Sequence, residues 1–352
     1  MSPETDDAGL ALSQPPVGID SIDEQGGAAL RAKSAHPRIN YRSWGRGTQL
    51  MPAWLVPFLS LIVVTTFFGI TAGSRFLSLS NFSFLLQQSA IIAIPAFGVT
   101  LIIIAGSIDL SVGSVVALTG MVGALVAVDH GLVVGLLAAL VTGLLAGLCN
   151  GLAFAVLKVP SFIVTLGMLS VARGVTVKVS GSQPENVPDS WLWFGEMPGI
   201  FILFAICFMG TSVLLHLTSF GRRTVALGGQ ERVARLAGVR VQQVKIILFC
   251  FGGLMAALGG IALSARVGAA TPDAAGGFEL TAIAAVVLGG TPLTGGIGNV
   301  LNTVIGALVL SMLLNGMVIL GVSGEIQLIT QGVVLVGAVL LSLDRAKIGI
   351  IK

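Results

Sequence analysis

Charged residues are scarce in this chain. Asp, Glu, Lys and Arg make up only 10% of its 352 residues, whereas apolar residues make up 55%. Soluble domains carry roughly 25% charged residues, so the composition excludes an ordinary soluble protein and predicts that lipid surrounds most of the chain. Lipid admits only helices and closed barrels, because every backbone polar group must be paired within the protein. Long apolar runs, in place of short alternating ones, favour helices.

Residues that carry covalent chemistry are also scarce. The three cysteines (Cys149, Cys207 and Cys250) fall inside apolar runs, match no metal-ligand spacing and predict no disulfide framework. The chain lacks a Gly-x-x-x-x-Gly-Lys-Ser/Thr segment, since Gly296 stands where that motif requires lysine. We therefore expect no catalytic residue, no bound metal or cofactor, no nucleotide site and no nucleic-acid partner. Solute transport is the expected function.

The apolar residues form about ten runs that predict transmembrane helices. These runs are 52–70, 83–104, 109–128, 132–157, 161–178, 199–217, 244–264, 279–290, 299–320 and 326–343. The run 279–290 is too short to cross a bilayer, which predicts either a half-helix or a helix that continues through the following glycines. The predicted fold class is an all-α membrane protein, a polytopic helical bundle of about ten transmembrane helices, some broken or half-length.

Polar composition sets the ends of the chain apart. Residues 1–50 lack apolar periodicity and predict a flexible cytoplasmic tail, residues 51–345 form the transmembrane domain, and residues 346–352 form a cytoplasmic C-terminal tail. With the N-terminus in the cytoplasm and an even number of spans, most of the 19 Lys and Arg residues lie on the inner side. The positive-inside rule therefore predicts that both termini are cytoplasmic.

The predicted cytoplasmic loop 218–245 contains a short helix. Glu231 lies near the expected N-terminus, Arg235 follows at i+4, and Gly238 suits the left-handed position that ends a helix. Two turns of isolated helix are unstable in water, so this helix must pack against something. It is either a docking element for a cytoplasmic partner or a solvated loop that only follows the positive-inside rule.

The loop resembles that of the permease subunits of ATP-binding-cassette importers for ribose, xylose, galactose and related sugars. Their loop reads approximately Gly-Gly-Asn-x-x-Ala-Ala-Arg-Leu-x-Gly, whereas this chain has Gln230 for Asn and Val233 for the first Ala. Residues 106–114 read Gly-Ser-Ile-Asp-Leu-Ser-Val-Gly-Ser and differ from the family's block only at Ser107. Blocks at 160–167 and 284–298 are also similar and follow in the same order, with Pro292 and the following Asn299 standing where serine is usual.

The resemblance implies a membrane subunit of a monosaccharide importer in the bacterial cytoplasmic (inner) membrane. Its implied partners are a second copy of the permease, an extracytoplasmic sugar-binding protein and a cytoplasmic ATPase that carries ATP and Mg. The residues implied to couple the chain to that ATPase are Gly228, Gly229, Gln230, Glu231, Ala234, Arg235, Leu236 and Gly238.

Candidate pathway residues lie in or beside the predicted spans. They are Asp109, Asn150, Gly289, Gly290, Thr291 and Asn315. Each candidate has a structural alternative: Asp109 can cap a helix, the glycine-rich break can be a tight turn, and the two asparagines can bond neighbouring helices. Arg173, at an outer helix end, can snorkel or pair with a carboxylate.

Two other functions remain open, one within the resemblance and one outside it. One is a permease of the same superfamily for nucleosides, branched-chain amino acids or a signalling molecule, because a separate binding protein often sets selectivity. The other is an ion-coupled secondary transporter. Secondary transporters often carry several ionisable groups deep in their spans, whereas Asp109 is almost the only such group here.

Overall fold

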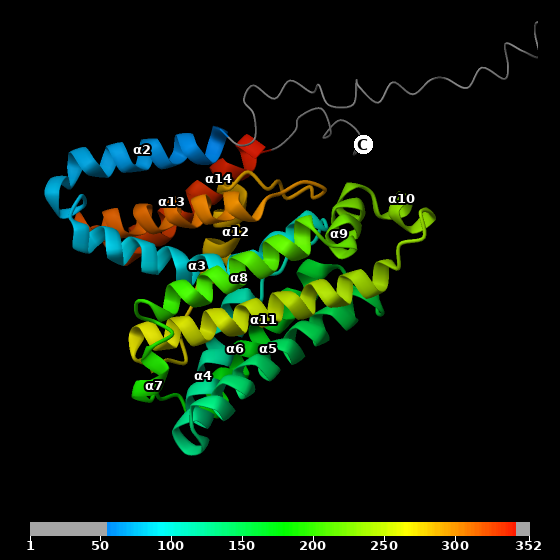
Figure 1. The fold of residues 1–352 in the computed structure, drawn as a ribbon, viewed down its shortest axis with the longest axis horizontal. Helices are drawn as coiled ribbons and strands as arrows, with labels where there is room; N and C mark the ends of the chain where they lie inside the picture. Colours follow the sequence, from blue (N-terminus) through cyan, green and yellow to red (C-terminus); the bar gives the residue numbers. More distant parts are fainter. Residues whose placement is uncertain (1–54, 343–352) are drawn as a thin grey trace, which may run out of the picture. The chain divides into compact units, whose positions relative to one another are not determined.

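The computed structural model describes residues 55–342, and the predicted tails at 1–50 and 346–352 lie outside the described residues. The elements are α2 (Leu55–Thr71), η2 (Gly73–Arg75), α3 (Leu79–Ile104), α4 (Val112–His130), α5 (Leu132–Ala155), α6 (Ser161–Val179), β1 (Glu185–Asn186), α7 (Asp189–Leu192), α8 (Gly199–His216), α9 (Ser219–Gly229), α10 (Glu231–Leu236), α11 (Val241–Val267), β2 (Ala269–Ala270), α12 (Phe278–Leu288), α13 (Val300–Ile319) and α14 (Gly324–Ser342). Helices dominate this part of the chain (Figure 1), as predicted for an all-α membrane protein.

Every predicted apolar run corresponds to a helix. Within residues 55–342, seven helices are long and apolar enough to cross a membrane, namely α3, α4, α5, α6, α8, α11 and α13. Three shorter apolar helices correspond to α2, α12 and α14. The only strands in the described region are β1 and β2, which pair antiparallel with Glu185 opposite Ala270.

The helix α12 is a half-helix. Its 11 residues rise about 16 Å at about 1.5 Å per residue, well short of a hydrocarbon core of about 30 Å. The alternative, a helix that continues through the glycines, is wrong. Gly290 adopts a left-handed φ of 83°, and the chain stays non-helical until α13 begins at Val300.

The core is built around α3, whose residues from Ser89 to Ile104 are all buried. Helices α8, α11, α12 and α13 pack on it. Pro95 lies inside α3, and a side chain at Gly259 of α11 would collide with its ring. Close packing at this crossing therefore depends on a missing Cβ.

Glycines also bring α5 and α11 together, and Figure 1 shows these helices side by side. A Cβ at Gly143 or Gly147 would collide with backbone carbonyls of Gly253 or Phe249, and one at Gly151 would meet Ile246. The absence of side chains at these three positions therefore lets α5 and α11 pack closely.

The region predicted as the loop 218–245 is mostly helical. Gly228 and Gly229 form the last turn of α9, Gln230 separates α9 from α10, and α11 already begins at Val241. The sequence does mark the α10 end correctly, because Gly238 adopts the left-handed conformation with φ of 82°.

Candidate functional site

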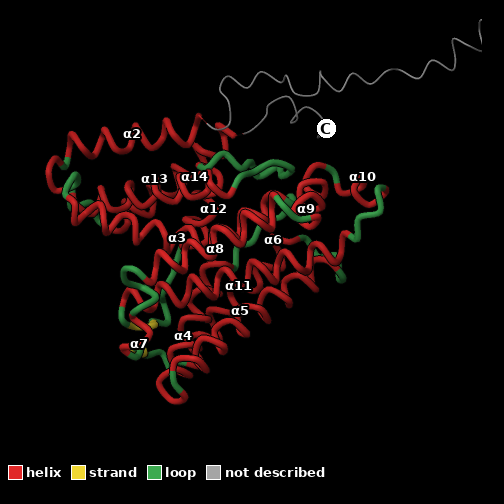
Figure 2. Tube along the Cα trace, in the orientation of Figure 1, coloured by secondary structure: helices red, strands yellow, loops and turns green. Residues whose placement is uncertain are grey.

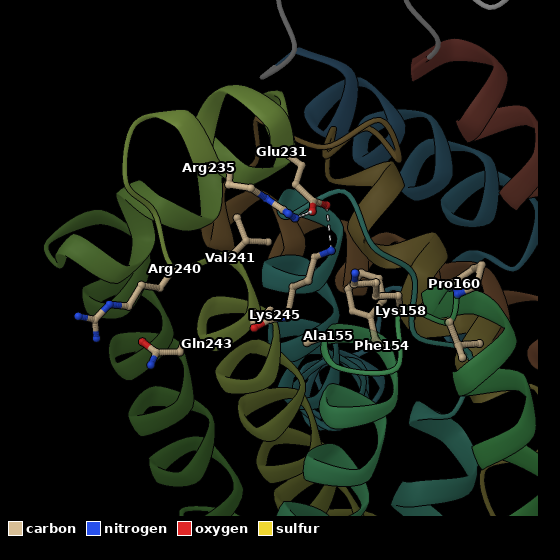
Figure 3. A pocket seen from close by; sticks show the side chains of 12 residues that line it. Phe154, Ala155, Lys158, Pro160, Glu231, Arg235, Arg240, Val241, Gln243 and Lys245 are labelled. Carbon is tan, nitrogen blue, oxygen red and sulfur yellow. Dashed lines mark hydrogen bonds and ion pairs between the residues drawn. The ribbon is translucent and has the colours of Figure 1, made fainter.

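Glu231 forms two ion pairs, one within α10 and one to α11. Arg235 donates to Glu231 Oε1 at 2.7 Å, the predicted i, i+4 pair, and Lys245 of α11 donates to Glu231 Oε2 at 2.9 Å. The Lys245 ammonium also lies 4.1 Å from the centre of the Phe154 ring of α5. Figure 3 shows these side chains converging below α10. Glu231 therefore links α10 to α11.

The electrostatics of Glu231 follow from these contacts. The Lys245 hydrogen bond, helped by the charges of Lys245 and Arg235, lowers the pKa of Glu231 below its ordinary value. Sequence analysis missed Lys245 as the partner because it lies 14 positions away on another helix. The sequence feature that could have identified Lys245 is a single cation inside an apolar run.

The opposite face of α10 exposes apolar side chains. Ala234 is 3% exposed and packs inward, whereas Val233 and Leu236 are 55% and 81% exposed. A helix of six residues has no stability of its own, so the inward contacts hold it in place. The outward face is then free to meet a partner.

A junction made almost entirely of glycine backbone joins α9 to two other segments. We call Ile104, Gly106, Gly228, Gly295 and Gly296 the glycine junction. Gly296 N–H donates to Ile104 O at 2.8 Å. A Cβ at Gly228 would collide with Ile104 O, and a Cβ at Gly295 would lie 2.8 Å from Gly106 Cα. No side chain fits at these contacts.

The glycine junction brings together three segments that are far apart in the sequence: the end of α3, the end of α9 and the loop between α12 and α13. Figure 2 shows that loop reaching α9. The α3 end leads directly into Asp109, and the loop is the predicted glycine-rich break. A movement of α9 must therefore act on both segments, because backbone contacts leave no compliant side chain between them.

Asp109 belongs to a buried polar cluster with Ser111 and Asn150. Ser111 donates to Asp109 Oδ1 through its backbone N–H at 2.8 Å and its hydroxyl at 2.6 Å. Asn150 of α5 donates to Ser111 Oγ at 2.9 Å. Ser111 is the N-cap residue of α4, so Asp109 accepts from the residue before the helix and does not cap its first turn. The candidates Asp109 and Asn150 thus share one cluster.

Ser111→Ala is expected to destabilise the protein by about 1–3 kcal/mol, because Asp109 loses a donor and the buried Asn150 amide loses its acceptor. The midpoint temperature of unfolding in detergent checks this. Ser114→Ala is the matched control: among residues 55–342, the Ser114 hydroxyl bonds only the Ser111 carbonyl, which also accepts from Val115 N–H. An equal drop in the midpoint temperature of unfolding in the two variants would contradict a bridging role for Ser111.

The other pathway candidates lie elsewhere. Asn315 donates to Asn81 Oδ1 at 2.7 Å and so joins α13 to the end of α3 opposite the glycine junction. The alternative in which the asparagine bonds a neighbouring helix therefore describes Asn315.

The Thr291 hydroxyl is buried without a partner among the described residues, and a Cβ at Gly289 would meet Asn302 of α13. The glycine-rich break after α12 is thus both a tight turn and a contact with α13.

Arg173 of α6 pairs with backbone rather than a carboxylate. Its guanidinium donates to Pro272 O at 3.0 Å and to Ala274 O at 2.8 Å. These bonds attach α6 to the segment between β2 and α12, so the snorkelling alternative does not describe Arg173.

Helix α6 combines two properties that conflict in a lipid-facing span. Of the seven long apolar helices within residues 55–342, it has both the smallest buried share and the lowest hydropathy. An added Cβ at Gly167 or Gly174 would meet no atom within 4 Å, so both glycines lie on its open face. A helix this exposed should be among the most apolar if lipid alone covered it.

The fold and these sites define a polytopic helical membrane protein with a short helix, α10, between two of its long apolar helices. The chain belongs to the permease family described as "Branched-chain amino acid transport system / permease component", whose model matches residues 81–339. It is therefore a transport subunit and not an enzyme.

The chain is also similar to named sugar permeases. The chain is 42% identical over 301 residues to the ribose import permease protein RbsC of Escherichia coli, which covers 82% of this chain and 94% of that protein. It is 41% identical to RbsC of Bacillus subtilis, covering 83% and 93%. It is 36% identical to the L-arabinose transport system permease protein AraH of Escherichia coli, covering 83% and 90%. No solved structure matches the chain.

Proposed function

We propose that this chain is the membrane-spanning permease subunit of an ATP-driven importer that translocates a monosaccharide delivered by an extracytoplasmic binding protein. The observation that carries the proposal is α10, a short helix anchored by Glu231 and Lys245 that presents Val233 and Leu236 to solvent. The relatives' names, ribose import and L-arabinose transport, support a pentose as the solute.

The exposed face of α10 fits a cytoplasmic ATPase partner, which would carry ATP and Mg. In this proposal, Gly228, Gln230, Ala234 and Gly238 set the position and ends of α9 and α10, whereas Gly229 ends α9 without a contact that requires glycine. Glu231 holds α10 on α11 through Lys245, Arg235 pairs with Glu231, and Leu236 enters the partner. Movement of the ATPase would then reach the Asp109 loop and the Gly289–Thr291 turn through the glycine junction.

A second copy of the chain fits the open face of α6. Small residues favour close helix contact, and a less apolar helix suits an interface beside a hydrophilic solute better than it suits lipid. The pathway would then run between two α6 helices, close to the cluster of Asp109 and Asn150. Thr165 of α6 already accepts the Leu110 N–H at 3.1 Å, next to that cluster.

The proposed location is the bacterial cytoplasmic (inner) membrane, with both termini inside. The cations of the α9–α11 region support this orientation through the positive-inside rule. They include Arg222, Arg223, Arg232 and Arg240.

Reconstitution tests the function directly. We expect proteoliposomes that contain this chain, its ATPase and its binding protein to accumulate labelled ribose or arabinose only when ATP is present on the ATPase side. Uptake that persists with an inactive ATPase and collapses with an uncoupler would assign an ion-coupled carrier instead. Competition by a nucleoside or a branched-chain amino acid, without competition by any pentose, would assign another solute.

A further inference from the structure

A cavity with surplus positive charge lies beneath α10, where α5 ends and α11 begins. Its volume is about 720 Å³, and its wall includes Lys158, Arg235, Arg240, Lys245 and the carboxylate of Glu231. Four cations against one anion leave an excess of three positive charges. The cavity therefore has the electrostatic character of an anion site.

Two of the four cations are already paired, and two are not. Glu231 accepts from both Arg235 and Lys245. Within the described residues, Lys158 and Arg240 form no ion pair, and both are exposed. Figure 3 shows them on opposite sides of the Lys245 side chain. They are the groups free to bind a ligand.

The backbone at Lys158 adds a second observation. Lys158 has φ of 58°, in the left-handed region that favours glycine, a few residues after the end of α5. A glycine there would relieve the conformational cost. The chain instead places a lysine at the cavity wall, which fits a requirement for its charge.

The position of the cavity points to lipid as the source of the anion. Helix α11 has 27 residues and is about 40 Å long at about 1.5 Å per residue, so it exceeds a hydrocarbon core of about 30 Å. In the orientation given under the proposed function, its Arg240–Lys245 end lies in the headgroup layer, where phosphates lie. Leu157 precedes the lining residue Lys158, and Ile247 lies two residues after the lining residue Lys245. They are 72% and 49% exposed, as expected for side chains that contact acyl chains.

We propose that this cavity binds the headgroup phosphate of an anionic phospholipid of the inner leaflet. Lys158 and Arg240 contact the phosphate, and the acyl chains lie along Leu157 and Ile247. Basic pockets between helices on the cytoplasmic side are suited to such headgroups. A bound lipid would brace α10 against α5 and α11. The proposal rests on the inward orientation given under the proposed function, but its test does not require transport.

Native mass spectrometry of the full-length protein tests the site, using equal amounts of phosphatidylglycerol and phosphatidylcholine. We expect selective retention of phosphatidylglycerol. The double variant Lys158→Gln with Arg240→Gln should weaken it about 30-fold, which corresponds to about 2 kcal/mol at about 1 kcal/mol for each cation. The matched control is Arg222→Gln with Arg223→Gln, which removes the same charge from the exposed surface of α9 and should leave retention unchanged.

Four results would overturn the proposal. They are wild-type retention by the pocket variant, equal loss in the control, displacement of the lipid by millimolar inorganic phosphate, and complete displacement by the cognate ATPase. Misfolding is excluded by Lys158→Gly, which removes the charge and relieves the left-handed backbone. This variant should unfold at the same or a higher temperature and still retain less phosphatidylglycerol.

Discussion

Gly228→Val is expected to abolish ATP-driven uptake by the reconstituted importer. The new Cβ would collide with Ile104 O and lie 2.6 Å from Gly296 N, and neither backbone atom can rotate away. The junction must then separate, and overpacking of this kind costs about 1–3 kcal/mol. The measurement is solute uptake together with ATP hydrolysis by the assembled complex. We expect hydrolysis to continue without transport.

Gly229→Ala is the matched control for this experiment. It follows Gly228 in the same helix, but a Cβ there meets no atom within 4 Å. Alanine also favours a helix over glycine by about 0.5–1 kcal/mol. Uptake should therefore remain at the wild-type level. Normal uptake by Gly228→Val, or equal loss in Gly229→Ala, would show that the glycine junction does not carry the coupling movement.

Leu236→Asp is expected to weaken binding of the cytoplasmic ATPase by about 30-fold or more. A buried apolar anchor at an interface contributes about 2 kcal/mol or more, and a carboxylate at that position would also have to lose its water. Because Leu236 is 81% exposed in the isolated chain, the temperature of unfolding should not change. Binding of the purified ATPase to the permease in nanodiscs gives the affinity.

Leu236→Met serves as the control for that measurement. It keeps an apolar side chain of similar volume, so the affinity should change little. If Leu236→Asp binds the ATPase as tightly as the unmodified chain, the exposed face of α10 is not the docking surface. The alternative, a solvated loop that only follows the positive-inside rule, would then hold.

The apolar helices could be predicted from the sequence because their signal is local. Each is a run of consecutive apolar residues, and glycines mark the ends of α10 and α12 at Gly238 and Gly289. Family resemblance also pointed to residues 228–238 as the segment that we propose couples the chain to an ATPase. These features depend on neighbouring residues and not on the three-dimensional arrangement.

The glycine junction could not be predicted, since its contacts join backbone atoms of residues 104, 228 and 296 and leave no side-chain pattern. The Glu231–Lys245 pair is hidden for another reason: its members lie on different helices, and many cations could have been the partner. Ser111 is ambiguous in sequence because a serine hydroxyl can bond its own turn or a neighbouring helix. The packing of the helices decides which of these two bonds the Ser111 hydroxyl forms.

Helix α11 is long and apolar enough to link structures on opposite sides of a bilayer. Near one end, Lys245 holds α10, and directly after the other end, β2 pairs with β1. Because no break interrupts the 27 residues between these attachments, a tilt imposed at one end must displace the other in the opposite direction about any pivot along the rod. Opening at one membrane surface and closing at the other would then be a single mechanical event, with no separate signal required.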